Sequence, residues 1–163
     1  MNETKKLRVA LFFGGVSSEH EVSCVSASTW LRALAQAPCA DRYEVFPVGI
    51  TKQGRWLACS PTPEAMADGS WEKGVDCTPC VLSPDRTDHG IWLLKDGKAE
   101  LVHIDICAPV MHGKNGEDGT IQGLFELARI PYVGCGVLGS AVCMDKAVAN
   151  TIMDLSLIHI SEP

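Results

Sequence analysis

The sequence is poor in positive charge and has no long uninterrupted run of apolar residues. Its 14 Lys and Arg are outnumbered by 20 Asp and Glu, so the net charge is -6. Such a chain repels a phosphate backbone, which argues against a general role in nucleic-acid binding. No run approaches the roughly 18 apolar residues of a membrane span, and Met1 to Lys6 lead into a short apolar run without a signal-peptide core. We therefore expect a cytoplasmic protein that acts on small molecules, without membrane or nucleic-acid partners.

The composition is that of an ordinary globular protein. With 163 residues, 46% of them hydrophobic, and a mean hydropathy of +0.09, the chain can fold as one domain with a substantial core. Eight cysteines would suit a small disulfide-rich secreted domain, but most of them lie inside apolar segments of a chain without an export signal. We predict buried thiols, as at Cys24, Cys107, Cys135 and Cys143.

The first fifty residues predict a strand, a helix and a second strand. Leu7 to Phe13 is an apolar run that ends at Gly14-Gly15, which is typical of a strand buried on both faces. Ser18 and Glu21 have the spacing of a capping box at a helix start. Tyr43 to Ile50 follows as the next strand, which gives a βαβ unit with a right-handed crossover. The residues expected to face the sheet from the helix are Val22, Val25, Ser26, Thr29, Trp30, Ala33 and Leu34.

The remaining chain indicates an insertion and then a return to alternating strands and helices. Residues 51–103 are broken by Gly, Pro and Asp and predict antiparallel strands, with a tight hairpin at Asp96-Gly97. Ile104 to Met111 predicts a buried strand, Thr120 to Ala128 an amphipathic helix, Pro131 to Val133 a brief strand, and Ser140 to Leu155 a further helix. The fold class is therefore an α/β protein with an open, mainly parallel sheet flanked by helices. Ligands bind such sheets at the carboxyl ends of the strands.

Two glycine-rich loops at predicted strand ends carry the candidate functional residues. In the first, Glu19 follows Gly14-Gly15 and could pair with an ammonium group, although an acidic first turn also simply favours a helix dipole. The second, His112 to Gly119, holds Lys114, Glu117 and Asp118, more polar chemistry than a turn requires. Asp118 could equally be a helix cap, Lys114 a solvated surface group, and His112 an ordinary buried histidine.

Three segments together resemble the D-alanine:D-alanine ligase family. They are Phe13 to Ser23, His112 to Gly123, and Tyr132-Val133-Gly134-Cys135-Gly136 through Met144-Asp145-Lys146, which are similar to the family in order and spacing. The resemblance covers Leu7 to about Met153. It implies a pre-ATP-grasp, Rossmann-like fold and a ligase that phosphorylates one D-alanine with ATP and lets the amine of a second attack the acyl phosphate, for peptidoglycan synthesis.

The resemblance also implies roles for individual residues. Glu19 matches the glutamate that holds the ammonium of the first D-alanine, and Val22 lies in the same substrate-binding segment. His112 matches the histidine beside the substrate carboxylate, and Glu117 matches the glutamate that supports the site. Lys146 matches the lysine that reaches a nucleotide phosphate. Family members are commonly homodimers and use ATP with Mg²⁺ or Mn²⁺, whose ligands lie in the part of the family sequence that follows Met153.

The resemblance divides the chain into three parts. Residues 1–139 form the amino-terminal substrate-binding domain with the 51–103 insertion, residues 140–153 begin the ATP-grasp region, and residues 154–163 do not resemble the family's continuation. We expect that this last part marks a truncation or foreign sequence. We also expect that the 163-residue chain alone has no ligase activity.

Other functions remain open at this point. D-alanine:D-lactate and D-alanine:D-serine ligases share the first substrate, so Glu19 and His112 cannot separate them. Gly134 to Gly139 fits a dinucleotide-binding fingerprint, but it comes after several strands and not in the first strand–helix turn. Cys77-Thr78-Pro79-Cys80 has a redox or zinc spacing without a second ligand pair, so we interpret it as a surface loop. A noncatalytic fragment that associates with other chains is the third class.

Overall fold

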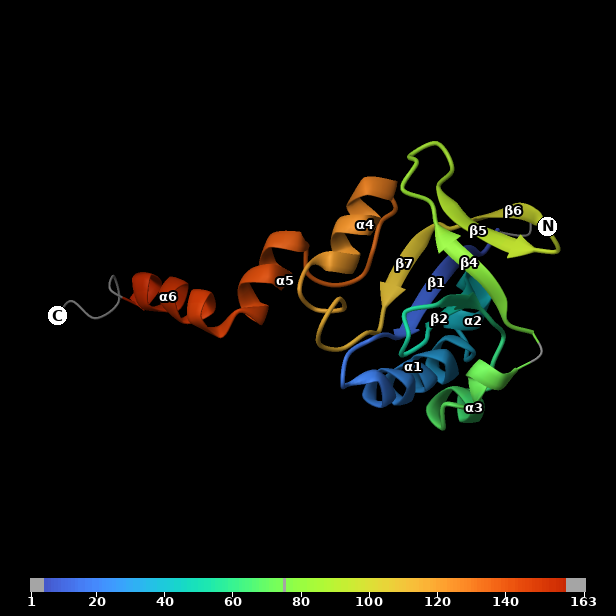
Figure 1. Ribbon diagram of the computed structural model, residues 1–163, viewed down its shortest axis with the longest axis horizontal. Coiled ribbons are helices and arrows are strands. Elements are labelled where there is room, and N and C mark those ends of the chain that lie inside the picture. The colour runs from blue at the N-terminus through green and yellow to red at the C-terminus, as the bar shows by residue number, and fades with distance from the viewer. Residues whose placement is uncertain (1–4, 75, 158–163) are drawn as a thin grey trace.

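The computed structural model describes residues 5–74 and 76–157 of the chain. They form one seven-stranded sheet with helices on both of its faces (Figure 1). The elements in chain order are β1 (Leu7–Gly14), α1 (His20–Leu34), α2 (Cys39–Arg42), β2 (Tyr43–Ile50), β3 (Trp56–Ala58), α3 (Pro63–Ala67), the 3-10 helix η1 (Ser70–Lys73), β4 (Thr78–Leu82), β5 (Gly90–Lys95), β6 (Lys98–His103), β7 (Ile106–Pro109), α4 (Thr120–Ala128), α5 (Val137–Met144) and α6 (Lys146–Leu157).

The sheet is open and mixed, with strand order β6-β5-β4-β3-β2-β1-β7. The pairs β1–β2 and β1–β7 are parallel, as expected for strands joined by crossover helices. The inserted residues 51–103 add β3 to β6 to the edge of this parallel unit, and all of their pairings are antiparallel. The predicted α/β class with an antiparallel insertion is confirmed, but the sheet is not mainly parallel as predicted, because four of the six pairings between neighbouring strands of the described chain are antiparallel. The inserted strands extend the sheet and do not form a separate one.

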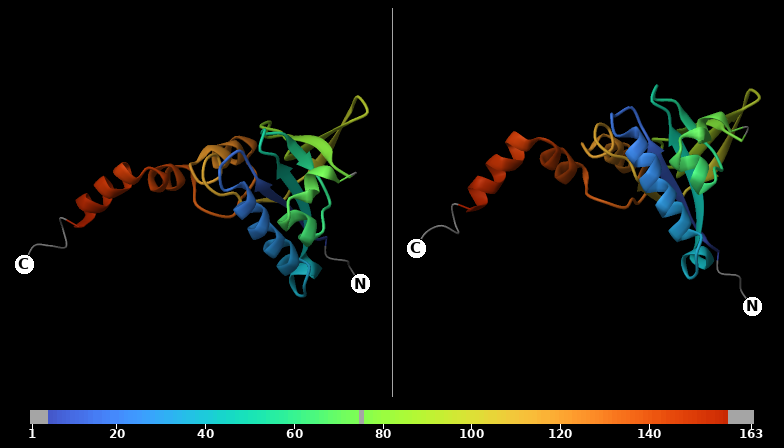
Figure 2. Two further views of the ribbon diagram at one scale, coloured as in Figure 1. Left: turned by 60° about the horizontal axis from the view of Figure 1, so that its bottom comes forward. Right: turned by 90° about the horizontal axis from the view of Figure 1, so that it is seen from below.

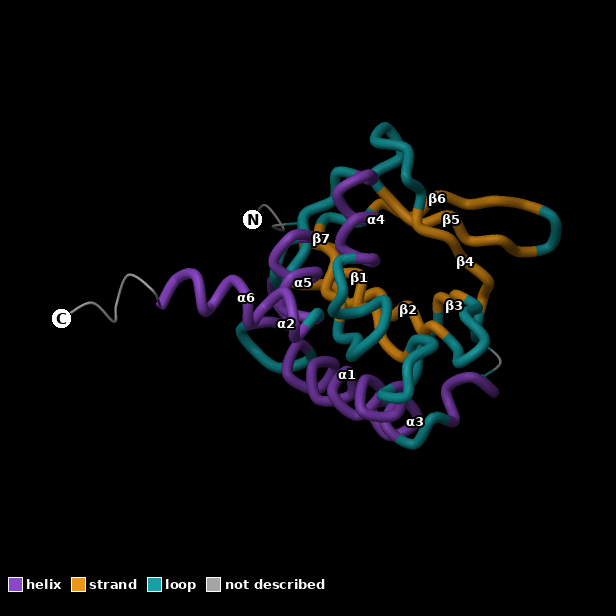
Figure 3. The backbone as a smooth tube through the Cα atoms, turned by 60° about the vertical axis from the view of Figure 1, so that its left-hand side comes forward, coloured by secondary structure: helices purple, strands orange, loops and turns teal. Residues whose placement is uncertain are grey.

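The β1 strand is buried on both faces and divides the core in two. Phe12 packs under α4 against Phe125, with ring centroids 5.2 Å apart. Phe13, on the opposite face, packs edge-to-face on Trp71 of η1 at 4.8 Å. Successive residues of one apolar strand therefore pack on opposite sides of the sheet, where α1 and α3 cover one face and α4 the other (Figure 3).

The start and the buried face of α1 differ from the sequence prediction. The helix begins at His20 with Glu19 as its N-cap and without a side-chain capping bond, so the Ser18–Glu21 capping box is wrong. Glu21 instead forms an ion pair with Lys52. Val22 and Val25, predicted to face the sheet, are each more than half exposed.

Small residues form the sheet-facing side of α1. Ser23, Cys24, Ala27 and Ser28 are buried, because short side chains let the helix backbone come close to the sheet. Ser23 uses this closeness directly. Its hydroxyl accepts a hydrogen bond from Gly14 N at 2.8 Å and donates one to the carbonyl of Val110. The apolar pattern of the helix did not predict this buried face, because a polar residue, Ser23, lies at its centre.

The hairpin at Asp96-Gly97 and the cysteines show mixed agreement with the predictions from sequence. The Asp96-Gly97 hairpin is confirmed, with positive φ at both residues and Lys95 opposite Lys98. The prediction that Cys77 to Cys80 is a surface loop is wrong, because Cys80 is buried within β4. All eight cysteines are free thiols, but Cys135 and Cys143 are exposed and not buried as predicted.

The carboxyl-terminal helices extend away from the sheet (Figure 2). The single helix predicted for Ser140 to Leu155 is two helices, which separate at Asp145 because its backbone is extended. Asp145 then begins α6, since its Oδ1 accepts hydrogen bonds from the N–H groups of Ala147 and Val148. Of the predicted atypical tail, residues 154–157 end α6 and residues 158–163 lie outside the described residues. None of the described helices is long and apolar enough to cross a membrane.

Candidate functional site

The two glycine-rich loops meet at one edge of the sheet. Gly14-Gly15 follows β1 and His112 lies shortly after β7, and these strands are parallel neighbours, so both loops leave the same end. Ser17 joins the loops directly: its hydroxyl donates to the His112 carbonyl at 2.7 Å and accepts from Glu19 N at 3.1 Å. The two glycine-rich loops therefore lie together at the carboxyl ends of β1 and β7, the place where ligands bind in open sheets of this kind.

Gly113 is the centre of the cluster because carboxylates flank it on two sides. A Cβ at position 113 would collide with Oε2 of Glu19, so the carboxylate rests directly on the glycine. From the other side, Gly113 N donates to Oε2 of Glu117 at 2.8 Å. Gly113 also has φ +66°, a left-handed conformation that favours glycine. A side chain at position 113 would displace the Glu19 carboxylate, whereas the bond to Glu117 uses only the backbone N–H.

His112 has a polar side chain near each of its ring nitrogens. Its Nδ1 lies 3.6 Å from Oε1 of Glu117, and its Nε2 shares a hydrogen bond with Oγ of Ser26 at 3.1 Å. The side chain is 31% exposed, so the ring is both oriented and reachable by a ligand. An oriented imidazole between a carboxylate and a hydroxyl can contact an anionic group or pass a proton.

His112 and Glu117 line a cleft of about 530 Å³ between the loop, α4 and α5. Gln122, only 5% exposed, also lines it; its Nε2 donates to Gly116 O at 2.8 Å, while its Oε1 has no hydrogen-bond partner among the described residues. The rest of the wall is largely apolar and includes Trp30, Val110, Met111, Val133 and Met144. The cleft thus offers acceptors and an imidazole in an apolar setting, which suits a small polar ligand.

Three of the five predicted site residues come together and two lie apart. Glu19, His112 and Glu117 surround Gly113 as described. Val22 is exposed on α1, one turn after Glu19. Lys146, the first residue of α6, lines a shallow hollow with Asp118 and Met144, apart from that cluster.

Asp118 has a structural role in the loop before α4, but it is not the helix cap that the sequence suggested, because Gly119 occupies the N-cap position. Its partial burial works to raise the pKa of the carboxyl, but hydrogen bonds from the N–H groups of Asn115 and Thr120 outweigh burial and lower that pKa. A carboxylate committed to two backbone amides stabilises the loop. We therefore assign Asp118 to the loop structure and not to ligand binding.

Sequence reasoning missed Ser17, Ser26 and Gln122. Ser26 lies seven residues, or about two helical turns, after Glu19, so helical spacing alone could have placed both on one side of α1. Ser17 gave no such signal, because its contact with His112 joins two loops that only the tertiary structure brings together. Gln122 bonds to Gly116, only six residues earlier, but no sequence motif marks this contact.

The described residues contain no cluster of side chains arranged to hold a metal ion. No group of three or more His, Cys, Asp or Glu side chains in residues 5–74 and 76–157 is arranged to hold a metal. At the start of α6, Asp145 already accepts hydrogen bonds from the N–H groups of Ala147 and Val148. Two backbone N–H groups at this helix start are therefore already bonded within the chain.

Comparisons with known proteins agree on one family. Residues 8–135 match the family model described as D-ala D-ala ligase N-terminus. A D-alanine--D-alanine ligase of Caldicellulosiruptor bescii is 50% identical over 147 residues, which is 90% of this chain and 38% of that protein. The solved structure of VanG D-Ala:D-Ser ligase from Enterococcus faecalis superimposes with a TM-score of 0.84 at 38% identity, covering 93% of this chain and 42% of that one.

A second solved structure, the D-alanine-D-alanine ligase from Coxiella burnetii, has a TM-score of 0.79 at 31% identity over 94% of this chain and 42% of that one. The chain thus spans about two fifths of the length of the relatives it matches.

Proposed function

This chain belongs to the D-alanine:D-alanine ligase family, and we propose that it is the amino-terminal, substrate-binding part of an ADP-forming ligase that joins two D-alanines for peptidoglycan synthesis. The observation that supports this most strongly is the meeting of Glu19, His112 and Glu117 around Gly113. An amino acid carries one ammonium and one carboxylate, and this cluster offers a carboxylate and an oriented imidazole.

We infer that Glu19 pairs with the ammonium of the first D-alanine. Fixing that end directs the substrate carboxylate toward His112, which Glu117 and Ser26 hold in place. Orientation of this kind contributes to catalysis because the bound substrate is restricted to one reactive arrangement. Val22, one turn along α1, would border the same substrate.

ATP and its divalent ion belong to the same proposal. We propose that Lys146 contacts a nucleotide phosphate, and that the ligands for Mg²⁺ or Mn²⁺ lie outside this chain. When bound, ATP supplies the phosphate that activates the substrate carboxylate. Residues 1–139 would then form the substrate-binding domain, residues 140–153 would begin the ATP-grasp region, and the whole protein would be a homodimer.

A second candidate is a ligase that joins D-alanine to D-serine or D-lactate. The similarity to the solved D-Ala:D-Ser ligase favours it, and the proposed contacts of Glu19 and His112 concern only the first substrate. A dinucleotide-binding function has less support, since Gly134 to Gly139 lead into α5 and no strand follows in the part of the chain that the structure describes.

Titration of the chain with D-alanine, followed by nuclear magnetic resonance of backbone amides, tests the proposed site. We expect shifts concentrated at Ser17 to Glu19 and at Gly113 to Glu117. Glu19→Gln should abolish them, whereas Glu21→Gln, which removes the same charge two residues away at the Lys52 ion pair, should not. D-lactate, which lacks the ammonium, should be insensitive to Glu19→Gln. Equal binding of D-alanine by wild type and Glu19→Gln would refute the site.

A chimera tests the reaction. Residues 1–153 would be joined to the remaining part of the 50%-identical ligase, and ADP release would be measured with D-alanine alone and with D-alanine plus D-serine or D-lactate. We expect D-alanine-dependent ADP release that Glu19→Gln removes. A folded chimera that is inactive with every substrate pair would contradict the proposed function.

A further inference from the structure

The turn that carries the proposed substrate carboxylate is built from conformationally free residues. Gly14, the last residue of β1, and Gly15, which follows it, have φ of +83° and +102°. The backbone N–H of Gly14 is fixed by Ser23 Oγ, and that of Gly15 by the carbonyl of Ile50 at 2.8 Å. These two bonds fix the beginning of the turn. They do not fix the peptide between Gly15 and Val16, which leads on to Glu19.

His20 provides that hold. It is the first residue of α1 and only 4% exposed. Its Nδ1 lies 2.7 Å from the carbonyl oxygen of Gly15. A carbonyl can only accept a hydrogen bond, so Nδ1 must carry a proton and donate it. The ring therefore fastens the last peptide of the turn to the residue that follows Glu19.

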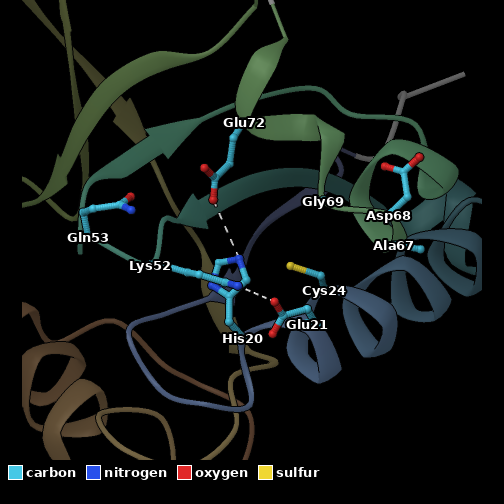
Figure 4. A pocket seen from close by; sticks show the side chains of 9 residues that line it. All are labelled: His20, Glu21, Cys24, Lys52, Gln53, Ala67, Asp68, Gly69 and Glu72. Carbon is cyan, nitrogen blue, oxygen red and sulfur yellow. Dashed lines mark hydrogen bonds and ion pairs between the residues drawn. The ribbon is translucent and has the colours of Figure 1, made fainter.

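The other side of the ring faces the inserted segment. His20 Nε2 lies 3.7 Å from Oε1 of Glu72 in η1, across a pocket of about 320 Å³ (Figure 4). The other titratable groups that line this pocket are Glu21 and Lys52, which pair with each other, Cys24 and Asp68. Trp71, beside Glu72, is 2% exposed and packs on Phe13, so η1 offers Glu72 from a firmly packed position.

We propose that His20 is the positioning residue of the amino-acid site: clamped between the Gly15 carbonyl and Glu72, its ring fixes the glycine turn and so the direction of the Glu19 carboxylate. The link to D-alanine rests on the proposed function, whereas the hold on the turn does not. Through Glu72, the inserted segment lies next to the ring that holds the turn.

Two substitutions distinguish the effect of the His20 hydrogen bond from the effect of the volume of its ring. In His20→Asn the side-chain amide N–H can take the position of Nδ1 and still donate to Gly15, although the contact with Glu72 is lost. His20→Leu keeps an apolar group of similar size and removes the donor. We expect D-alanine affinity within about twofold of wild type for His20→Asn, and a loss of about fivefold for His20→Leu, the effect of one lost hydrogen bond.

Amide relaxation of Ser17, Ser18 and Glu19, measured without ligand, gives a readout that does not depend on the proposed function. His20→Leu should increase the mobility of these three amides and His20→Asn should not. If both variants lower the stability to unfolding equally and leave the turn unchanged, His20 is only a core residue and the inference is overturned. If wild type does not bind D-alanine but the turn responds as expected, the proposed function fails and the positioning role stands.

Discussion

Gly113→Ala is the change that most directly tests how the site is assembled. An L-residue at φ +66° costs roughly 1–2 kcal/mol in backbone conformation. The new methyl group would also displace the Glu19 carboxylate, which is the far end of a flexible side chain and can move aside. A charge-assisted hydrogen bond contributes about 1.5–3 kcal/mol, so we expect D-alanine to bind roughly ten- to a hundredfold more weakly.

Gly97→Ala is the matched control. Gly97 has a similar φ of +73° at the β5–β6 hairpin, but a Cβ there meets no atom within 4 Å. Urea unfolding should show similar losses of stability for the two variants, while amide titration with D-alanine should show weaker binding only for Gly113→Ala. If Gly113→Ala binds D-alanine as tightly as Gly97→Ala, the carboxylate near Gly113 does not hold the ligand, and the reasoning from this contact is refuted.

Three further predictions concern stability and reactivity. Phe125→Ala should lower the free energy of unfolding by about 3–5 kcal/mol in urea titrations, because the ring is fully buried. The pKa of the Asp105 carboxyl is lowered, chiefly by the hydrogen bond that it accepts from a backbone N–H. The ionised carboxylate therefore stabilises the folded chain at pH values above the unfolded pKa near 3.8, and this stabilisation is lost as the pH falls through the lower pKa of the folded chain. In Asp105→Asn the free energy of unfolding should therefore fall less steeply as the pH is lowered below about 4. An unchanged pH dependence in this variant would contradict the prediction. Iodoacetamide should label exposed Cys135 and Cys143 first, whereas Cys107, whose pKa burial raises to about 12, should react only on unfolding, as mass spectrometry would show.

The sequence predicted those elements whose signal is local. β1 and β2 are continuous apolar runs, α4 has a clear helical period, and Asp96-Gly97 favours a tight hairpin whatever surrounds it. The inserted segment gave weaker signals, so α3, η1 and β4 were not predicted. These elements are short and gain their stability from packing, as Trp71 does against Phe13.

Helix α1 shows where periodicity misleads. Its valines suggested a buried face, but Val22 and Val25 are exposed while Ser23 is fully buried between two strand ends. A polar residue can occupy the core when both its donor and its acceptor are satisfied, and no single-sequence pattern reports such partners. The predicted capping box is absent for a related reason. Glu21 forms an ion pair with Lys52, which lies in another part of the chain.

The sequence by itself determined that this is an α/β chain of the ligase family with glycine-rich loops after two strands, because those signals lie in neighbouring residues. Only the tertiary structure decided which side chains share a site. Ser17 bonds to the backbone carbonyl of His112 across 95 residues, and Ser26 bonds to the His112 ring across 86. Contacts between such distant positions follow from the parallel pairing of β1 with β7 and the approach of α1 to the sheet, which depend on the packing of the whole core.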